Sequence, residues 1–173
     1  MASIKFSNPR WLIALAVPLL LLGTAWTGSP ASKDAYVNSH LGFSMAPPSF
    51  TVDPAVAVAT VAQFYAPPAN GFADNLNVQI HRAPFAAFCK KSDEEFKSGS
   101  YTLIASKDLK LGTAAAHEYH YRAKASNFDL EFISVAVASG DDTYLLTATA
   151  LQSDFAKIEP AFRAAIESFK LDK

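Results

Sequence analysis

The sequence predicts an α+β domain with a mostly antiparallel sheet of about six to seven strands. Three observations lead to this fold class. Segments that alternate apolar and polar residues follow one another, turn residues separate them, and the last segment changes to helical spacing. The chain has 173 residues, of which 50% are apolar and 18% charged, so it can bury one core of ordinary size.

Three strands are predicted in the first half of this domain. Residues 41–45 alternate apolar and small side chains and stop at a proline pair. Residues 57–65 are rich in valine, alanine and aromatic side chains and stop at a second proline pair. In residues 76–81, Leu76, Val78 and Ile80 alternate with polar side chains, which is the period of a half-buried strand.

A short helix and four further strands are predicted next. Ser92 and Glu95 have the spacing of a capping box, and Gly99 can end the helix in a left-handed conformation. Gly140 lies in a turn between the last two strands, which should therefore form an antiparallel hairpin. The four predicted strands are residues 101–106, 113–123, 128–139 and 143–151.

The C-terminal segment predicts an amphipathic helix. From Phe155 to Phe169, apolar residues recur at steps of three and four, which places them on one helix face. Ser153 or Asp154 can cap its start. Pro160 falls inside the pattern, so we expect a kink or a restarted helix there.

An uncharged run with a tryptophan at each end, Trp11 and Trp26, precedes the domain. Lys5 and Arg10 lie before this run and no acidic residue does, so its N-terminal flank should stay in the cytoplasm. Everything after the run is therefore expected to be exported, to the periplasm or the extracytoplasmic face of the membrane.

The run has the features of a cleaved signal peptide and also those of a retained anchor. A basic start, an apolar centre and small residues before the possible cleavage points favour a signal. The run would span ~24 Å as a helix, less than a ~30 Å hydrocarbon core. However, Arg10, Trp11 and Trp26 lie where anchors meet the membrane surface. We expect cleavage, with anchoring through residues 11–26 as the alternative. Residues 1–31 are then signal or anchor with a tether, and residues 32–173 the domain.

The order of these elements resembles the PsbP-like family, which is named after an extrinsic protein of photosystem II. The resemblance covers residues 36–171 and includes the strings DNLNV at 74–78, TYLLTAT at 143–149 and IESF at 166–169. Other matching segments are the GFS at 42–44 with the proline pair that follows it, the Leu-Gly pair at 111–112 before the strand at 115–121, and Phe155.

This resemblance implies an α/β/α sandwich around an antiparallel sheet, and docking onto other proteins without catalysis. Family members commonly have a tryptophan soon after the first strand's prolines, where this chain has Phe50. The chain also lacks the Arg- and Ser-rich character of a plant transit peptide, so the photosynthetic role cannot be carried over.

The strongest cluster of chemistry-bearing residues is the string HEYHYR at 117–122. On a strand, His117, Tyr119 and Tyr121 share one face, and Glu118, His120 and Arg122 share the other. If the strand at 76–81 lies close, His81, His120 and Glu118 could bind zinc. The ordinary interpretation is a solvated polar face, with His117 as a buried, hydrogen-bonded histidine.

Enzyme classes with recognisable motifs are not supported. No nucleophile elbow, glycine-rich phosphate loop or H-E-x-x-H motif occurs, and we expect neither catalysis nor a cofactor. No basic run exceeds Lys90 and Lys91, so nucleic acid is not an expected partner. Cys89 is the only cysteine, which excludes an internal disulfide and is typical of a small buried apolar residue.

The candidate interface consists of Phe85 and Phe88, together with Phe72 in the preceding loop. If exposed, these rings would form an apolar patch of the kind that marks interfaces. The alternative is that they cover an edge of the core.

The leading hypothesis is an exported, non-catalytic accessory protein, such as an extrinsic subunit of a bacterial membrane complex, photosynthetic or other. The alternative is a periplasmic small-ligand or metal-binding module, or an enzyme, that uses His81 and His120.

Overall fold

The computed structural model describes residues 35–52, 60–99 and 101–172. In chain order the described elements are β1 (Tyr36–Asn38), β2 (Phe43–Met45), β3 (Thr51–Val52), β4 (Thr60–Tyr65), β5 (Asn75–His81), α1 (Phe85–Lys97), β6 (Thr102–Leu111), β7 (Ala114–Ala125), β8 (Phe128–Ser139), β9 (Asp142–Leu151), α2 (Phe155–Glu167) and β10 (Lys170–Leu171).

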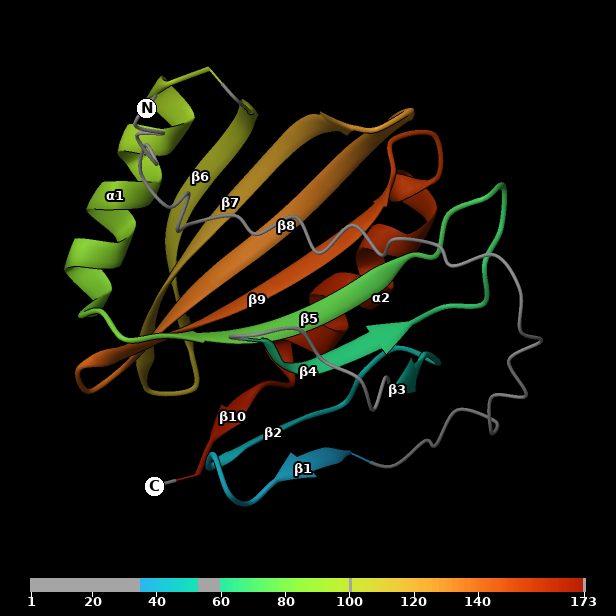
Figure 1. Cartoon of the computed structure of the whole chain (residues 1–173). Helices are drawn as coiled ribbons and strands as arrows, with labels where there is room; N and C mark the ends of the chain where they lie inside the picture. The colour runs from blue at the N-terminus through green and yellow to red at the C-terminus, as the bar shows by residue number, and fades with distance from the viewer. Residues whose placement is uncertain (1–34, 53–59, 100, 173) are drawn as a thin grey trace, which may run out of the picture.

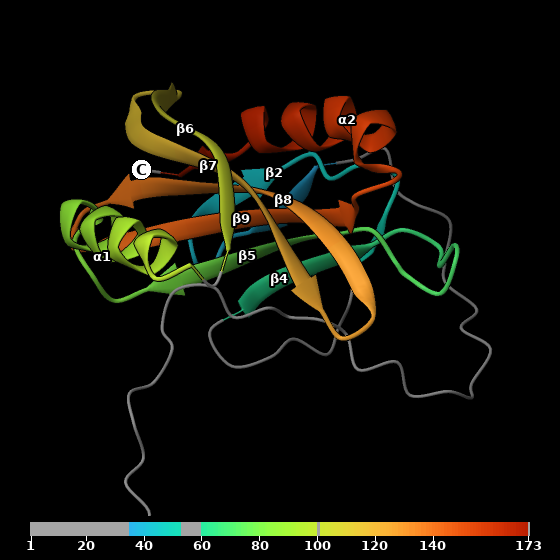
Figure 2. The same ribbon diagram turned by 90° about the horizontal axis from the view of Figure 1, so that it is seen from above.

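The larger of two sheets has seven described strands in the order β3-β4-β5-β9-β8-β7-β6, and each neighbouring pair is antiparallel. Figure 1 shows this sheet face on, with α1 in front at one side and α2 behind. Figure 2 shows from above that the two helices lie on opposite faces of the sheet. The predicted α+β class and the α/β/α sandwich implied by the resemblance are therefore confirmed.

The face toward α2 carries the main core. Directly paired positions across four strands are all apolar and buried there, as in the row Phe64, Leu76, Ala148 and Ile133. From α2, Phe155, Phe162 and Ile166 join this core, and Phe162 is fully buried. Each such side chain contributes ~1.5–3 kcal/mol on burial.

The face toward α1 divides into two parts. Under the helix it is apolar, because Phe88 packs on Ala136 and Leu145 while Phe96 packs on the Tyr119 and Tyr121 rings. Beyond the helix, over β9, β5 and β4, the side chains on the same face are amides and hydroxyls. The α1 face therefore has an apolar part under the helix and a polar part beyond it.

A small sheet in the order β1-β2-β10 joins the first described strand to the C-terminal end of the chain. Its Phe43 is fully buried and contacts the rings of Tyr144 and Phe169 at centroid distances of 5.9 and 5.6 Å. The small sheet, which lies at the bottom of Figure 1, therefore shares the main core.

Several predicted element boundaries need correction. Helix α1 begins at Phe85 after Pro84, not at Ser92, although Gly99 does follow it with a φ of +80°. Helix α2 continues through Pro160 as one helix and does not restart. The strands β1, β3 and β10 were not predicted, whereas the hairpin at Gly140 is confirmed.

The predicted signal or anchor, with Arg10, Trp11 and Trp26, lies outside the described residues. Among the helices that the structure describes, none is long and apolar enough to cross a membrane.

Candidate functional site

His81, the first of the three predicted metal ligands, lies on the α1 face of the sheet. Its ring is 4.9 Å from that of Phe88, and its Nε2 is 3.1 Å from the side-chain oxygen of Gln79. Burial, together with the charge of Lys91, lowers the pKa of His81. The neutral imidazole is therefore the favoured form in the folded protein.

The other two predicted ligands lie on the α2 face, where each has its own ion-pair partner. His120 stacks on Phe155 at 5.3 Å, and its Nε2 is 2.7 Å from Oε1 of Glu131. Glu118 accepts hydrogen bonds from Arg163 at 3.0 and 3.1 Å. These contacts fix the strand against α2.

The structure does not bring His81, His120 and Glu118 together, and this corrects the predicted zinc site. Strands β9 and β8 lie between β5 and β7, so three strand spacings, ~14 Å, separate the two histidine positions along the sheet. The two histidines also face opposite sides of it. No group of three or more His, Cys, Asp or Glu side chains in the described part of the chain could hold a metal ion.

His117 and Cys89 lie on the α1 side and belong to the packing of this helix. The His117 ring is 4.5 Å from that of Tyr119, and its Nδ1 is 2.6 Å from Oδ1 of Asp108. The Tyr119 hydroxyl donates to the carbonyl of Cys89 and to Asp93. Burial raises the pKa of the Cys89 thiol, which disfavours the reactive thiolate.

The predicted phenylalanine interface is not an exposed patch. Phe88 is 3% exposed under α1, and Phe72 is 4% exposed and packs on the Phe128 ring at 5.4 Å. Phe85 is half-buried against the same small cluster as Phe88. The alternative interpretation, that these rings cover an edge of the core, is the one that the structure bears out.

Among the described residues, two adjacent exposed apolar side chains lie instead on β6, at one edge of the large sheet, and a third, Val37, lies on β1. In the described part of the chain β6 pairs with β7 alone. Leu103 and Ile104 are 42% and 44% exposed, and a register shift lies between Leu103 and Ala105. Two adjacent large apolar residues inside a predicted strand were the signal for this surface, because neighbouring side chains on a strand cannot both face one core.

The polar part of the α1 face consists of neutral side chains in register across β4, β5 and β9. We call this set the amide face: Gln63, Asn75, Asn77, Gln79, Thr147 and Thr149. All six are less than 9% exposed. Three of its buried atoms, Gln63 Nε2, Asn75 Oδ1 and Asn77 Oδ1, have no hydrogen-bond partner among the described residues. Each unpaired buried group costs ~1–3 kcal/mol.

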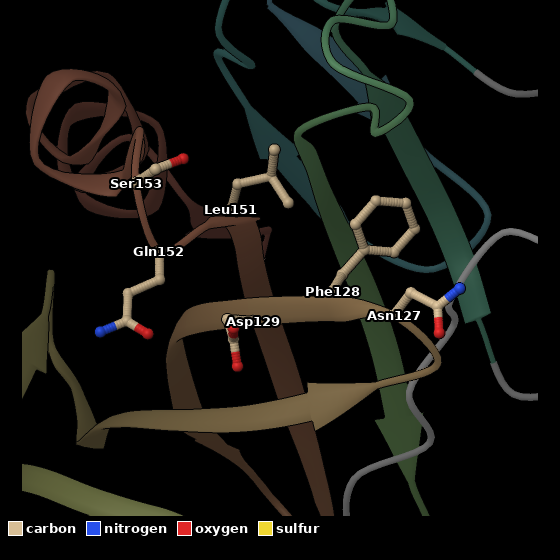
Figure 3. Close-up of a pocket in the computed structure, with 6 residues that line it drawn as sticks. All are labelled: Asn127, Phe128, Asp129, Leu151, Gln152 and Ser153. Carbon is tan, nitrogen blue, oxygen red and sulfur yellow. The ribbon is translucent and has the colours of Figure 1, made fainter.

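A pocket of about 460 Å³ lies at the end of the β8–β9 pair. It is lined by Asn127, Phe128, Asp129, Leu151, Gln152 and Ser153 (Figure 3). Asp129 forms an ion pair with Lys124 at 3.2 Å, and the Gln152 amide can accept from Arg122. The pocket therefore holds polar groups that already have partners within the protein.

An antiparallel sheet between two helices, extended by a small sheet of the two chain ends, is a PsbP-like fold. The predicted resemblance is therefore confirmed at the level of the fold. The solution structure of cyanobacterial PsbP, CyanoP, from Synechocystis matches with a TM-score of 0.59 at 13% identity, covering 87% of this chain and 98% of that chain.

Two bacterial crystal structures are also similar. A protein of unknown function from Pseudomonas aeruginosa matches with a TM-score of 0.58 at 17% identity, over 78% of this chain and 94% of that chain. LpqN of Mycobacterium tuberculosis, which is involved in cell envelope biogenesis, matches with a TM-score of 0.53 at 13% identity, over 73% and 86%. No family model and no curated protein matches the sequence.

Proposed function

We propose that this chain is an exported accessory protein that docks onto a protein partner at the membrane and has no catalytic step. The β6 edge is the observation that carries this proposal. In the described part of the chain, β6 has a neighbouring strand on one side only. Such an edge offers main-chain donors and acceptors to an added strand, and Leu103 and Ile104 offer apolar contacts beside them. The partner, a membrane complex, would bind by adding one of its extended segments to the β6 edge.

Export is supported by the basic flank and the uncharged run of the first 31 residues. The cell-envelope role of LpqN, which shares the fold, agrees with it. A retained anchor would raise the effective concentration of the domain near a membrane partner. The mass of the mature protein from its native source distinguishes cleavage from retention.

The absence of a catalytic step is supported by the pairing of the histidines that a reaction would use. His120 is paired with Glu131, and His117 with Asp108. A general base must be within reach of a substrate proton, whereas His120 is packed between Glu131 and Phe155, and the Nε2 atom of His117 is buried.

Photo-crosslinking in the native host tests the docking surface. A photoreactive amino acid is placed at Ile104, and in a control chain at Val37, which is 61% exposed on β1. We expect a membrane-protein adduct from position 104 alone, reduced at least tenfold by the added Leu103→Glu substitution. Equal adducts from both positions, or none from position 104, would contradict docking through β6.

A further inference from the structure

Strand β6 carries charged as well as apolar side chains, and the two kinds are separated along its length. The apolar pair, Leu103 and Ile104, lies near its start. The charged residues, Lys107, Asp108 and Lys110, lie in its second half, and all five side chains are exposed. A segment added to this edge of the large sheet therefore meets an apolar region at one end and a charged region at the other (Figure 1).

The charged residues of β6 are not equally available to a partner. Asp108 is already paired, because its Oδ1 lies 2.6 Å from Nδ1 of His117. Lys107 lies 3.5 Å from Glu118, but that carboxylate also accepts two hydrogen bonds from an arginine of α2, and the Lys107 side chain is 60% exposed. Lys110 has no ion-pair partner in the described part of the chain. The edge therefore offers two ammonium groups and no equally available carboxylate.

The two lysines lie on opposite faces of the sheet. Lys107 is in register with Glu118 on the α2 face, and Lys110 is in register with Ala115 on the α1 face. Side chains alternate along an added strand as well, so two of its carboxylates three residues apart also lie on opposite faces. A segment with this spacing can place one carboxylate beside each lysine.

We propose that the extended segment that docks onto β6 has two acidic residues three positions apart, followed three positions later by two adjacent apolar residues. This inference rests on the docking function proposed above and specifies the chemistry of the partner. Antiparallel pairing, which joins every neighbouring pair of strands in the large sheet, sets the order of the residues. When the first acidic residue lies opposite Lys110, the second lies opposite Lys107. The apolar pair then lies opposite Ile104 and Leu103.

The same features make the edge selective. Lysine side chains on an edge strand oppose the addition of further strands, and so does a bulge. Strand β6 has both, because its register shifts between Leu103 and Ala105. A segment with carboxylates at the matched positions compensates the lysine charges, whereas a neutral or basic segment does not.

A second copy of this chain fits the edge less well. If two β6 strands pair antiparallel with Lys110 opposite the copy's Asp108, Ile104 lies beyond the end of the copy's β6 at Leu111. A register centred on Ser106 keeps Ile104 within the copy's strand, but it places both lysines opposite uncharged residues. Neither register provides the ion pairs and the apolar contacts together.

Binding of synthetic peptides to the full chain tests the proposed pattern. The probe is a fluorescein-labelled peptide of sequence TETTETTVIT, and the comparisons are TKTTKTTVIT and the reversed sequence TIVTTETTET. Fluorescence anisotropy at low salt should give a Kd about tenfold lower for the probe than for either comparison. The Lys110→Glu variant should raise the Kd of the probe about fivefold. Lys170→Glu, which makes the same charge change at an exposed position of β10, should leave it unchanged.

Photo-crosslinking from position 104 in the native host separates failure of this pattern from failure of docking itself. Mass spectrometry of the adduct gives the sequence of the captured segment, in which we expect acidic residues at the third and sixth positions before the crosslinked residue. The yield of the adduct should fall about fivefold with Lys110→Glu and stay unchanged with Lys170→Glu.

Four results would overturn the pattern. A captured segment without these acidic residues, or an adduct yield that Lys110→Glu leaves unchanged, would do so and still leave docking through β6 in place. Equal Kd values for the acidic and the basic peptide would have the same meaning. An adduct with the mass of two chains would assign the edge to a second copy. The absence of any adduct from position 104 would overturn both the pattern and the docking function.

Discussion

At the scale of single residues, the Glu131 carboxylate explains why His120 has a structural role. Glu131 is 5% exposed, and its two oxygens lie 2.7 Å from His120 Nε2 and 2.7 Å from Arg122 Nε. A buried carboxylate needs such partners, and removing one of them weakens the compensation of its charge. His120 is therefore held by a group that faces α2, and a metal ion would have to displace that group.

His81 should make stability depend on pH. Its pKa is lowered from 6.5 by burial and by Lys91, so on acidification the unfolded chain binds a proton before the folded protein does. Stability is expected to fall as the pH drops below about 6.5, and to stop falling below the folded pKa. Urea unfolding at pH 7.5 and 5.5 should show a smaller loss for His81→Leu than for the unchanged protein.

A control and a contrary result complete this prediction. Lys91→Ala removes the second cause of the shift and should reduce the pH-dependent loss only in part. If His81→Leu and the unchanged protein lost equal stability between the two pH values, His81 would not be the group responsible.

The residues of the candidate sites were predictable only as far as strand alternation reaches. Alternation correctly placed His117 and Tyr119 on one face of the strand, and Glu118 and His120 on the other. It could not place His81 relative to His120, because the order of strands in a sheet depends on contacts between distant segments. Alternation also predicts that the unpaired amides Asn75 and Asn77 share one face of their strand. It does not predict that these polar side chains are buried.

At the scale of elements, α1 shows how a local signal can mislead. Ser92 has the spacing of a helix cap, yet it is buried within the helix and its hydroxyl donates to the carbonyl of Phe88. The actual start follows Pro84, and Phe88, Ser92 and Phe96 are the buried positions at four-residue steps. Because the helix already begins at Phe85, Phe88 lies on the same buried helix face as Ser92 and Phe96 and packs on the sheet.

Replacement of Pro160 in α2 should stabilise the protein. The ring lacks the N–H that would bond to the carbonyl of Ala156, and residue 160 is exposed on the helix surface. Pro160→Ala restores this donor but makes the unfolded chain more flexible, so we expect a net gain of about 2 kcal/mol. Thermal unfolding measures the difference.

Lys157→Ala, at an exposed position of the same helix, is the matched control and should change stability by less than about 0.5 kcal/mol. A loss of stability in Pro160→Ala would show instead that proline fixes a bend that the packing of α2 requires.

At the scale of the whole molecule, pairings between neighbouring segments could be predicted from the sequence, whereas the pairing of distant strands in the small sheet could not. The β8–β9 hairpin follows from one turn, and the terminal helix follows from one periodic segment. The small sheet instead joins β1 and β2 to β10, which lie more than a hundred residues apart. Two- and three-residue strands carry too little pattern to reveal such a pairing.

Because the small sheet and the large sheet share one core, we expect them to unfold together. Phe43 of β2 is fully buried between Tyr144 of the large sheet and Phe169 beside β10, so Phe43→Ala should cost ~3–5 kcal/mol. Unfolding followed by far-UV and near-UV circular dichroism should give coincident midpoints, shifted equally in the variant. Val37→Ala, at an exposed position on β1, should leave both midpoints unchanged. A separate early transition, with hydrogen exchange in β2 preceding that in β8, would mean that the small sheet is an independent unit that the core does not hold.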